Sequence, residues 1–169
     1  MSAEQRVSVQ EYLATAYRPD RDYVEGVVEE RNLGEFDHSR LQLLIAAALM
    51  QGESRHGFIA LTEQRVQVKP DRFRIPDVCI IRKQDREQIV TKAPLLCVEI
   101  LSPEDTHTRL VVRLEDYLAL GVPECWVVDP KLRRGYVYSQ AGLIPAHDGV
   151  LTLAGTNLSV DLAPLFAQL

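Results

Sequence analysis

The longest apolar segments of this chain have the length of buried strands. Residues 95–101 read LLCVEIL and residues 124–129 read ECWVVD. A near-continuous apolar run of five to seven residues is typical of a central strand that is covered on both faces. Residues 58–68 and 74–81 predict two further strands, separated by a turn at Pro70 and Asp71.

Three segments have the spacing of amphipathic helices. The longest begins at Asp37 and is expected to end near Gly52, with Asp37 or Ser39 as the expected N-cap. Residues 8–17 begin with capping-box spacing, and residues 108–120 stop at Gly121. In the longest helix the apolar residues recur every three or four positions, at Leu41, Leu44, Ile45, Ala48 and Leu49.

Shorter elements complete the pattern. Residues 22–32 alternate around Gly26 and predict a hairpin, and residues 135–138 and 150–153 predict two outer strands of a meander. The end of the chain, residues 161–169, predicts a short helix capped by Asp161. Helices that cover both faces of a mixed central sheet make a three-layer α/β or α+β fold. No linker or repeat interrupts the pattern, so we expect one domain over residues 1–169.

Composition narrows the class of protein. The 169 residues are 46% hydrophobic and 25% charged, which is ordinary for a globular domain. The chain has no run of eighteen apolar residues and no signal-peptide pattern, so we expect a cytoplasmic protein without a membrane span. The net charge of −5 argues against a strong sequence-independent grip on DNA, although a local basic patch remains compatible with it.

The three cysteines carry no chemistry in this reading. Cys79, Cys97 and Cys125 all lie in apolar segments, and their number and spacing match neither a disulfide framework nor a structural zinc site. We expect them to be small buried side chains on strands.

Two acids stand where apolar residues are expected. Glu99 lies in the middle of LLCVEIL, and Asp77 lies at the start of the apolar segment that follows Pro76. A buried carboxylate needs a raised pKa, a cationic partner or a bound metal ion. If the two strands are neighbours, their acids could hold Mg²⁺ or Mn²⁺ and promote hydrolysis of a phosphodiester. A buried salt bridge, or an acid at a solvated strand end, is the alternative.

These acids also belong to a recognisable arrangement. Pro76-Asp77 followed by Glu99 resembles the PD-(D/E)xK nuclease signature. Nearly the whole chain resembles the Uma-type family of restriction endonucleases. The matching stretches are the hairpin at residues 22–26, His38 at the start of the long helix, IPDVCII, VEILSP, LEDYLALGVPECWVVDP and the closing meander.

The resemblance implies a restriction-endonuclease-like core, a divalent metal (Mg²⁺ or Mn²⁺) and cleavage of DNA. Asp77 takes the place of the first family acid and Glu99 that of the second. Asp22 and Glu25 match acids of the early hairpin and become candidate metal ligands. His38 matches a histidine near the same cleft, although it could instead cap the helix or bond a carboxylate.

The chain departs from the family pattern at its basic residue. In the simplest form of the signature a lysine follows the second acid by two positions, where this chain has Leu101. Uma-type proteins usually supply a lysine from the next helix, at the position of Arg113. Arginine can stabilise a phosphate but effectively never gives up its proton. Arg113 could also form a permanent ion pair with Glu99 and leave no place for a metal.

Two functions therefore remain open. The leading one is a Mg²⁺-dependent endonuclease that acts on DNA as a homodimer, since two sites are needed to cut both strands. The rival is a catalytically inactive binding or assembly protein in which Arg113 neutralises Glu99. Basic side chains that could flank a DNA groove are Arg72, Arg74, Lys131, Arg133 and Arg134.

Overall fold

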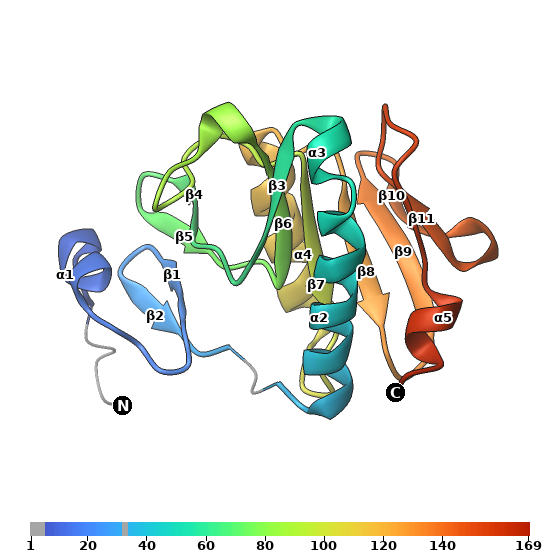
Figure 1. The fold of residues 1–169 in the computed structure, drawn as a ribbon. Helices are drawn as coiled ribbons and strands as arrows, with labels where there is room; N and C mark the ends of the chain where they lie inside the picture. Colours follow the sequence, from blue (N-terminus) through green and yellow to red (C-terminus); the bar gives the residue numbers. More distant parts are fainter. Residues whose placement is uncertain (1–5, 32–33) are drawn as a thin grey trace.

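The computed structural model describes residues 6–31 and 34–169 (Figure 1). Its helices are α1 (Val9–Ala14), α2 (Phe36–Met50), α3 (Glu53–His56), α4 (His107–Leu120) and α5 (Ala163–Phe166). Its strands are β1 (Asp22–Val24), β2 (Val27–Glu29), β3 (Phe58–Thr62), β4 (Val66–Lys69), β5 (Arg72–Arg74), β6 (Val78–Arg82), β7 (Leu96–Ile100), β8 (Cys125–Asp129), β9 (Arg134–Ser139), β10 (Gly142–Pro145), β11 (Val150–Thr152) and β12 (Ser159–Asp161).

A six-stranded mixed sheet forms the centre of the α+β fold. Its strand order is β10-β9-β8-β7-β6-β3. Strands β7 and β8 are parallel and are joined through α4, while the other neighbours are antiparallel. The predicted mixed sheet with helices on both faces is confirmed, because α2 lies over one face and α4 over the other (Figure 1).

Alternation along the central strands divides the core between the two helices. Val98 and Trp126 point toward α2 and its Leu41, Ile45 and Leu49. The three cysteines alternate with them and are buried on the α4 side, which confirms that they are small core residues without a disulfide. A strand that is buried on both faces has few polar positions. A carboxylate in β7 therefore needs a raised pKa, a cationic partner or a bound metal ion.

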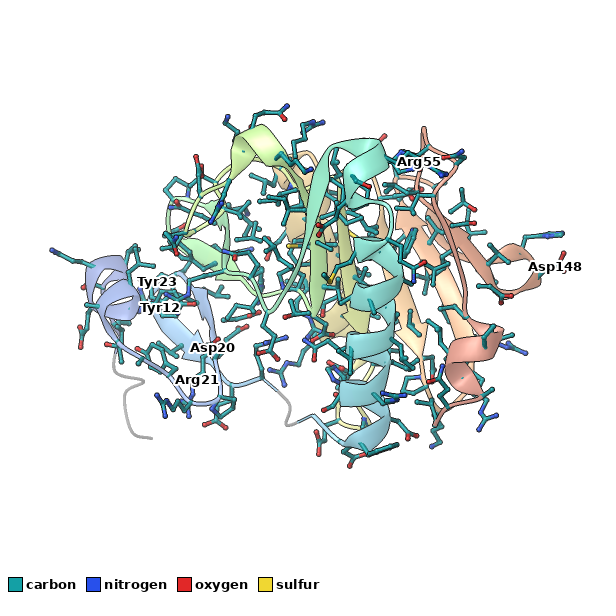
Figure 2. All side chains as sticks on the ribbon, viewed as in Figure 1. Tyr12, Asp20, Arg21, Tyr23, Arg55 and Asp148 are labelled. Atoms are coloured by element: carbon teal, nitrogen blue, oxygen red, sulfur yellow. The ribbon has the colours of Figure 1, made fainter. Side chains whose placement is uncertain are left out.

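A second sheet, of order β2-β1-β5-β4, lies beside the central one. One of its faces holds an aromatic cluster in which Tyr12 of α1 stacks on Tyr23 of β1 at 4.9 Å and packs against Phe73 of β5 (Figure 2). Tyr23 and Phe73 are cross-strand partners, so their neighbours Asp22 and Arg74 share the opposite face. This second face of the sheet turns toward α4.

Several boundaries differ from those that the pattern predicts. The segment at residues 58–68 is two strands in two different sheets, because Glu63 takes a left-handed conformation (φ 49°) and breaks the strand. The predicted strand over residues 74–81 is likewise divided: Arg74 ends β5, and β6 begins only after Pro76, which has no N–H to give to a ladder. Strand β10 was not predicted.

The predicted helix caps were also wrong in two places. Helix α2 begins at Phe36 after Glu35, and neither Asp37 nor Ser39 is its N-cap. The last helix is a single turn, and Leu162 is its N-cap. Asp161 belongs to β12, although its carboxylate accepts the N–H of Ala163 at 3.0 Å. No helix in the described ranges combines the length and the hydropathy of a membrane span.

The Ile80→Val variant should measure how tightly the central strand is packed. Ile80 is fully buried in β6 between α2 and the neighbouring strands. Loss of one methylene there should lower the free energy of unfolding by about 0.5–1.5 kcal/mol in denaturant titrations. Ile144→Val removes the same group from an exposed position of β10 and should change almost nothing. Equal effects of the two variants would contradict this description of the core.

Candidate active site

Asp77 and Glu99 come together through the register of β6 and β7. The two strands pair antiparallel with Val78 opposite Val98 and Cys79 opposite Cys97. The next position of this register places Asp77 beside Glu99, with both side chains on the α4 face. The Oδ2 atom of Asp77 also accepts the N–H of Ile100 at 2.7 Å, which fixes the carboxylate against β7.

The carboxylate of Asp77 lies between an arginine and a histidine side chain. Nη2 of Arg31 donates to its Oδ1 at 2.9 Å, and Nε2 of His38 lies 3.3 Å from its Oδ2. Burial alone would raise the pKa of Asp77, but the hydrogen bond from His38 and the charge of Arg31 hold this pKa below its ordinary value. Burial would lower the pKa of His38, and its contact with Asp77 raises it instead. Asp77 is therefore ionised at neutral pH.

Glu99 is held differently. Its Oε2 accepts Nε of Arg113 at 3.0 Å, and its Oε1 accepts the hydroxyl of Tyr117 at 2.8 Å. Burial raises the pKa of Glu99 to about 7, because the attraction of Arg113 offsets the desolvation only in part and the charge of Asp77 adds to it. Arg113 also donates to Asp105 at 3.1 Å. The ion pair between Arg113 and Glu99 that the sequence suggested as an alternative is therefore present.

Next to these acids, a charged row crosses the second sheet. We call Glu29, Asp22 and Arg74 the charged row. Asp22 of β1 lies opposite Glu29 of β2 on one side and beside Arg74 of β5 on the other. Nη1 of Arg74 donates to Asp22 at 2.9 Å and to Glu29 at 3.0 Å, and its Nε donates to Asp116 of α4 at 2.8 Å. Burial raises the pKa of Asp22 even though Arg74 opposes it. The row fastens the second sheet to α4.

This row corrects one expectation about DNA contact. Arg72 and Arg74 were candidates for the flank of a DNA groove. Arg74 is buried in the charged row, and Arg72 binds Asp116 at 2.7 Å and also pairs with Glu25. Neither guanidinium is available as part of an exposed basic patch.

An open pocket of about 230 Å³ lies over these acids, between the second sheet and the N-terminal half of α4. Six carboxylates line it: Asp22, Glu29, Glu30, Asp77, Glu99 and Asp105. Four guanidinium groups line it as well: Arg31, Arg74, Arg109 and Arg113. With all of these groups ionised the lining has a formal charge of −2, which would repel a phosphate unless a cation compensates for it.

The structure brings most of the predicted site residues to this pocket. Asp77, Glu99, Asp22 and Arg113 all line it. His38 contacts Asp77 without being part of the lining. Glu25 does not reach the pocket, because it occupies the turn between β1 and β2 (φ 51°) with an exposed side chain that pairs with Arg72. Glu29, the last residue of β2, lines the pocket instead.

Sequence reasoning missed several partners of the acids. Arg31 follows β2 without any pattern that marks it, and Asp105 lies in a loop. Tyr117 is a buried aromatic residue of α4, and nothing in the sequence indicates that its hydroxyl donates to Glu99. Asp116 is the one missed residue that the sequence could have revealed. It is the neighbour of Tyr117 and is buried with it, and a buried acid needs a cationic partner.

The donor set of the pocket suits a divalent cation, but it is engaged in ion pairs. Among residues 6–31 and 34–169, no three His, Cys, Asp or Glu side chains form a metal-binding group. Oδ1 of Asp22 is nevertheless buried without a hydrogen-bond partner in the described structure and belongs to the lining. Hard carboxylate oxygens, with a formal charge of −2 when every lining group is ionised, match Mg²⁺ or Mn²⁺. Binding would require Arg113 or Arg31 to release its carboxylate.

Comparison with one solved structure supports the fold. The crystal structure of a putative nuclease belonging to DUF820, from Anabaena variabilis ATCC 29413, has a TM-score of 0.83 and 22% sequence identity, and the match covers 95% of this chain and 98% of that one. A cryo-EM structure of a DrdV–DNA complex has a TM-score of 0.42 and 14% identity, over 75% of this chain and 11% of that chain. No curated protein matches the chain.

A family model identifies the chain more directly. The model for the family named Uma2, described as "Putative restriction endonuclease", matches residues 9–163. This span includes every element from α1 to the start of α5, and it contains both acids of the pocket. The chain therefore belongs to the Uma2 family of putative restriction endonucleases.

Proposed function

We propose that this protein is a Mg²⁺- or Mn²⁺-dependent endonuclease that hydrolyses phosphodiester bonds of DNA. The observation that carries the proposal is the placement of Asp77, directly before β6, beside Glu99 of the neighbouring strand β7 and beneath an open pocket lined by more carboxylates than guanidinium groups. Membership of the Uma2 family supports the same reaction class. We also propose that residues 1–169 work as one domain.

Asp77, Glu99 and Asp22 are the proposed metal ligands. A divalent ion there would polarise the phosphodiester and make a water molecule a stronger nucleophile. The chain supplies the remaining parts. His38 and Arg31 keep Asp77 ionised, and Tyr117 orients Glu99.

Arg113 has two possible carboxylate partners, and this gives it a role in binding substrate. Its Nε contacts Glu99 while its Nη2 contacts Asp105. If Glu99 turns to a metal ion, Asp105 would keep the guanidinium in the pocket, where it could bind a phosphate oxygen. Arg113 stays protonated throughout, because Glu99 and Asp105 raise its pKa above an already high ordinary value and outweigh its burial. It would therefore stabilise charge and not act as a base.

The second candidate function is a catalytically inactive binding or assembly protein. The specific observation in its favour is the Arg113–Glu99 pair, which satisfies the buried acid without a metal. A buried ion pair can have a purely structural role, and breaking one by removing a single partner is costly.

Calorimetric titration with Mn²⁺ separates the two functions. The endonuclease proposal expects binding to the wild type and no binding to Asp77→Asn, a change that keeps the shape of the side chain and removes its charge. Cleavage of supercoiled plasmid in Mg²⁺, and its arrest by EDTA, should follow the same pattern. A folded wild type that binds no Mn²⁺ and leaves plasmid intact would favour the inactive alternative. If the wild type is inactive in both assays, the Arg113→Lys variant should be assayed as well.

Arg109 is the proposed contact for a phosphate that neighbours the cleaved one. It lies in the first turn of α4 at the pocket, and its guanidinium donates to the carbonyl of Glu30 at 3.2 Å. The other three arginines of the lining are paired with carboxylates, whereas no described carboxylate lies within 4.0 Å of Arg109. Helix N-termini also favour phosphate.

The Arg109→Gln variant should therefore bind duplex DNA more weakly than wild type, measured by fluorescence anisotropy in Ca²⁺. Loss of one phosphate contact should reduce the slope of log K against log salt by about one. Arg86→Gln, at an exposed arginine outside the pocket, is the matched control and should keep the wild-type slope. An unchanged slope for Arg109→Gln would remove this residue from the proposed DNA contact.

A further inference from the structure

Helix α2 has an apolar outer side. Its inner side packs on the central sheet through Leu41, Ile45 and Leu49, as expected for a surface helix. On the outer side Phe36 is 71% exposed, Leu43 59% and Met50 57%. These three residues are seven positions apart, so they lie along one line of the helix, two turns from each other. We call them the α2 stripe.

The α2 stripe has few of the charges that normally solvate an exposed helix. From Leu41 to Met50 the helix has no charged residue, and Arg40, between Phe36 and Leu43, donates to the side-chain amide oxygen of Gln168 at 2.8 Å. Helix α4, which covers the opposite face of the sheet, has four charged residues and mixes them with its apolar ones. Figure 1 shows α2 on the outside of the molecule with the sheet behind it. A row of exposed apolar side chains of this kind indicates a surface that binds another protein.

Charges at the two ends of α2 indicate what kind of protein binds to the stripe. Glu35 and Asp37 are exposed at its N-terminal end, and Arg55 is exposed on α3, which follows its C-terminal end (Figure 2). None of the three belongs to an ion pair in the described structure. An antiparallel second copy of α2 would bring each acidic end to a basic end, and a parallel copy would bring like charges together.

We propose that the α2 stripe is the interface of a homodimer in which two copies of α2 pack antiparallel about a two-fold axis. The axis passes near Leu43, the middle residue of the stripe, so that Leu43 packs against Leu43 of the partner subunit. Phe36 then packs against Met50 of the partner subunit. The interface is self-complementary, as a two-fold contact must be.

The same helix carries contacts to the candidate active site. From its first turns, Nε2 of His38 lies 3.3 Å from Asp77, and Gln42 donates to the carbonyl of Asp77 at 3.0 Å. An α2 interface would therefore join two pockets through one pair of helices. This consequence rests on the proposed endonuclease function, since cleavage of both strands needs two sites. The interface itself does not depend on it.

Oligomeric state in solution tests the interface independently of cleavage. Light scattering after gel filtration should give a wild-type mass of twice 19.1 kDa. Leu43→Glu places two like charges on the two-fold axis and should raise the dimer dissociation constant by at least about 100-fold, since such a juxtaposition costs several kcal/mol. Leu132→Glu alters another exposed leucine, away from α2, and should leave the dimer intact. A monomeric wild type at about 100 µM, or a dimer that only Leu132→Glu dissociates, would overturn the proposal.

Cross-linking and charge reversal keep the proposal testable if Leu43→Glu folds poorly. Leu43→Cys should form a disulfide-linked dimer on mild oxidation, and the native cysteines should not compete because all three are buried. Leu132→Cys should stay monomeric on a denaturing gel. Asp37→Arg alone should weaken the dimer, and Asp37→Arg with Arg55→Asp should restore it. If the double variant is as weak as the single one, the antiparallel arrangement is wrong.

Discussion

Replacing Glu99 with glutamine is expected to lower the rate of DNA cleavage by about 100- to 1000-fold, the scale on which single electrostatic groups contribute to catalysis. Glutamine has the size of glutamate and can still accept the hydroxyl of Tyr117, so the fold should survive. It offers a divalent cation a neutral amide oxygen in place of a carboxylate, which is a weaker ligand. It also leaves Arg113 with Asp105 as its one carboxylate partner in the described structure.

The measurement is the initial rate of plasmid nicking in Mg²⁺, with the melting temperature of each variant recorded alongside. Glu104→Gln removes an exposed carboxylate that does not line the pocket, and it should cleave like wild type. Full activity in Glu99→Gln would exclude Glu99 from the reaction. Equal losses in both variants would point to a general effect of charge.

The pH dependence of the stability of Glu99→Gln tests the protonation state of Glu99. Burial raises the pKa of Glu99 from 4.5 to about 7 in the folded protein. Between these values the folded chain binds a proton that the unfolded chain has lost, so the contribution of Glu99 to stability falls as pH rises. Glutamine has no such dependence. Relative to wild type, Glu99→Gln should therefore be more stable at pH 8 than at pH 5, as measured by urea titration.

The central strands and their acids were visible in the sequence for a simple reason. A carboxylate inside LLCVEIL conflicts with burial on both faces, and the conflict itself marks Glu99. The same reasoning applies to Asp77, and β6 and β7 are indeed neighbours. Helix α4 could be predicted with its stop because Gly121 adopts a left-handed conformation that favours glycine (φ 112°).

The partners of these acids could not be predicted, because they depend on register and on contacts between distant segments. Glu25 and Glu29 look alike in the sequence, but the β1–β2 register sends Glu25 to the turn and sets Glu29 beside Asp22. Arg31 reaches Asp77 across 46 positions of the chain. Arg74 looked like an exposed base beside Pro76, and only the pairing of β5 with β1 shows that it faces α4.

Replacing Arg74 with methionine should be among the most destabilising single changes on this face of the protein. Arg74 binds three carboxylates, those of Asp22, Glu29 and Asp116, and its side chain is only 3% exposed. Its removal leaves Asp22 and Asp116 buried with less compensation. Breaking a buried ion pair from one side typically costs about 3–5 kcal/mol. For a chain of this length, such a loss lowers the melting temperature by roughly 10 °C.

The effect of Arg74→Met should grow with pH. Burial already raises the pKa of Asp22, and Arg74 is the largest opposing influence. Without Arg74 this pKa rises further, so the folded variant holds a proton on Asp22 over a wider range above the ordinary value of 3.8. Across that range stability falls as pH rises, because the unfolded chain binds fewer protons than the folded one. The difference in melting temperature from wild type should therefore be larger at pH 8 than at pH 5.

A surface pair provides the control for this variant. Lys92 contacts Asp85 at 2.8 Å with a side chain that is 61% exposed, so water already weakens this pair, and after Lys92→Met the carboxylate still has Arg82 at 3.8 Å. Its melting temperature should stay close to that of wild type at both pH values. A small, pH-independent loss in Arg74→Met, no larger than in Lys92→Met, would mean that the charged row is not what fastens the second sheet to α4. A large loss confined to high pH would show that the uncompensated acids, and not the missing packing of the arginine, are what destabilise the variant.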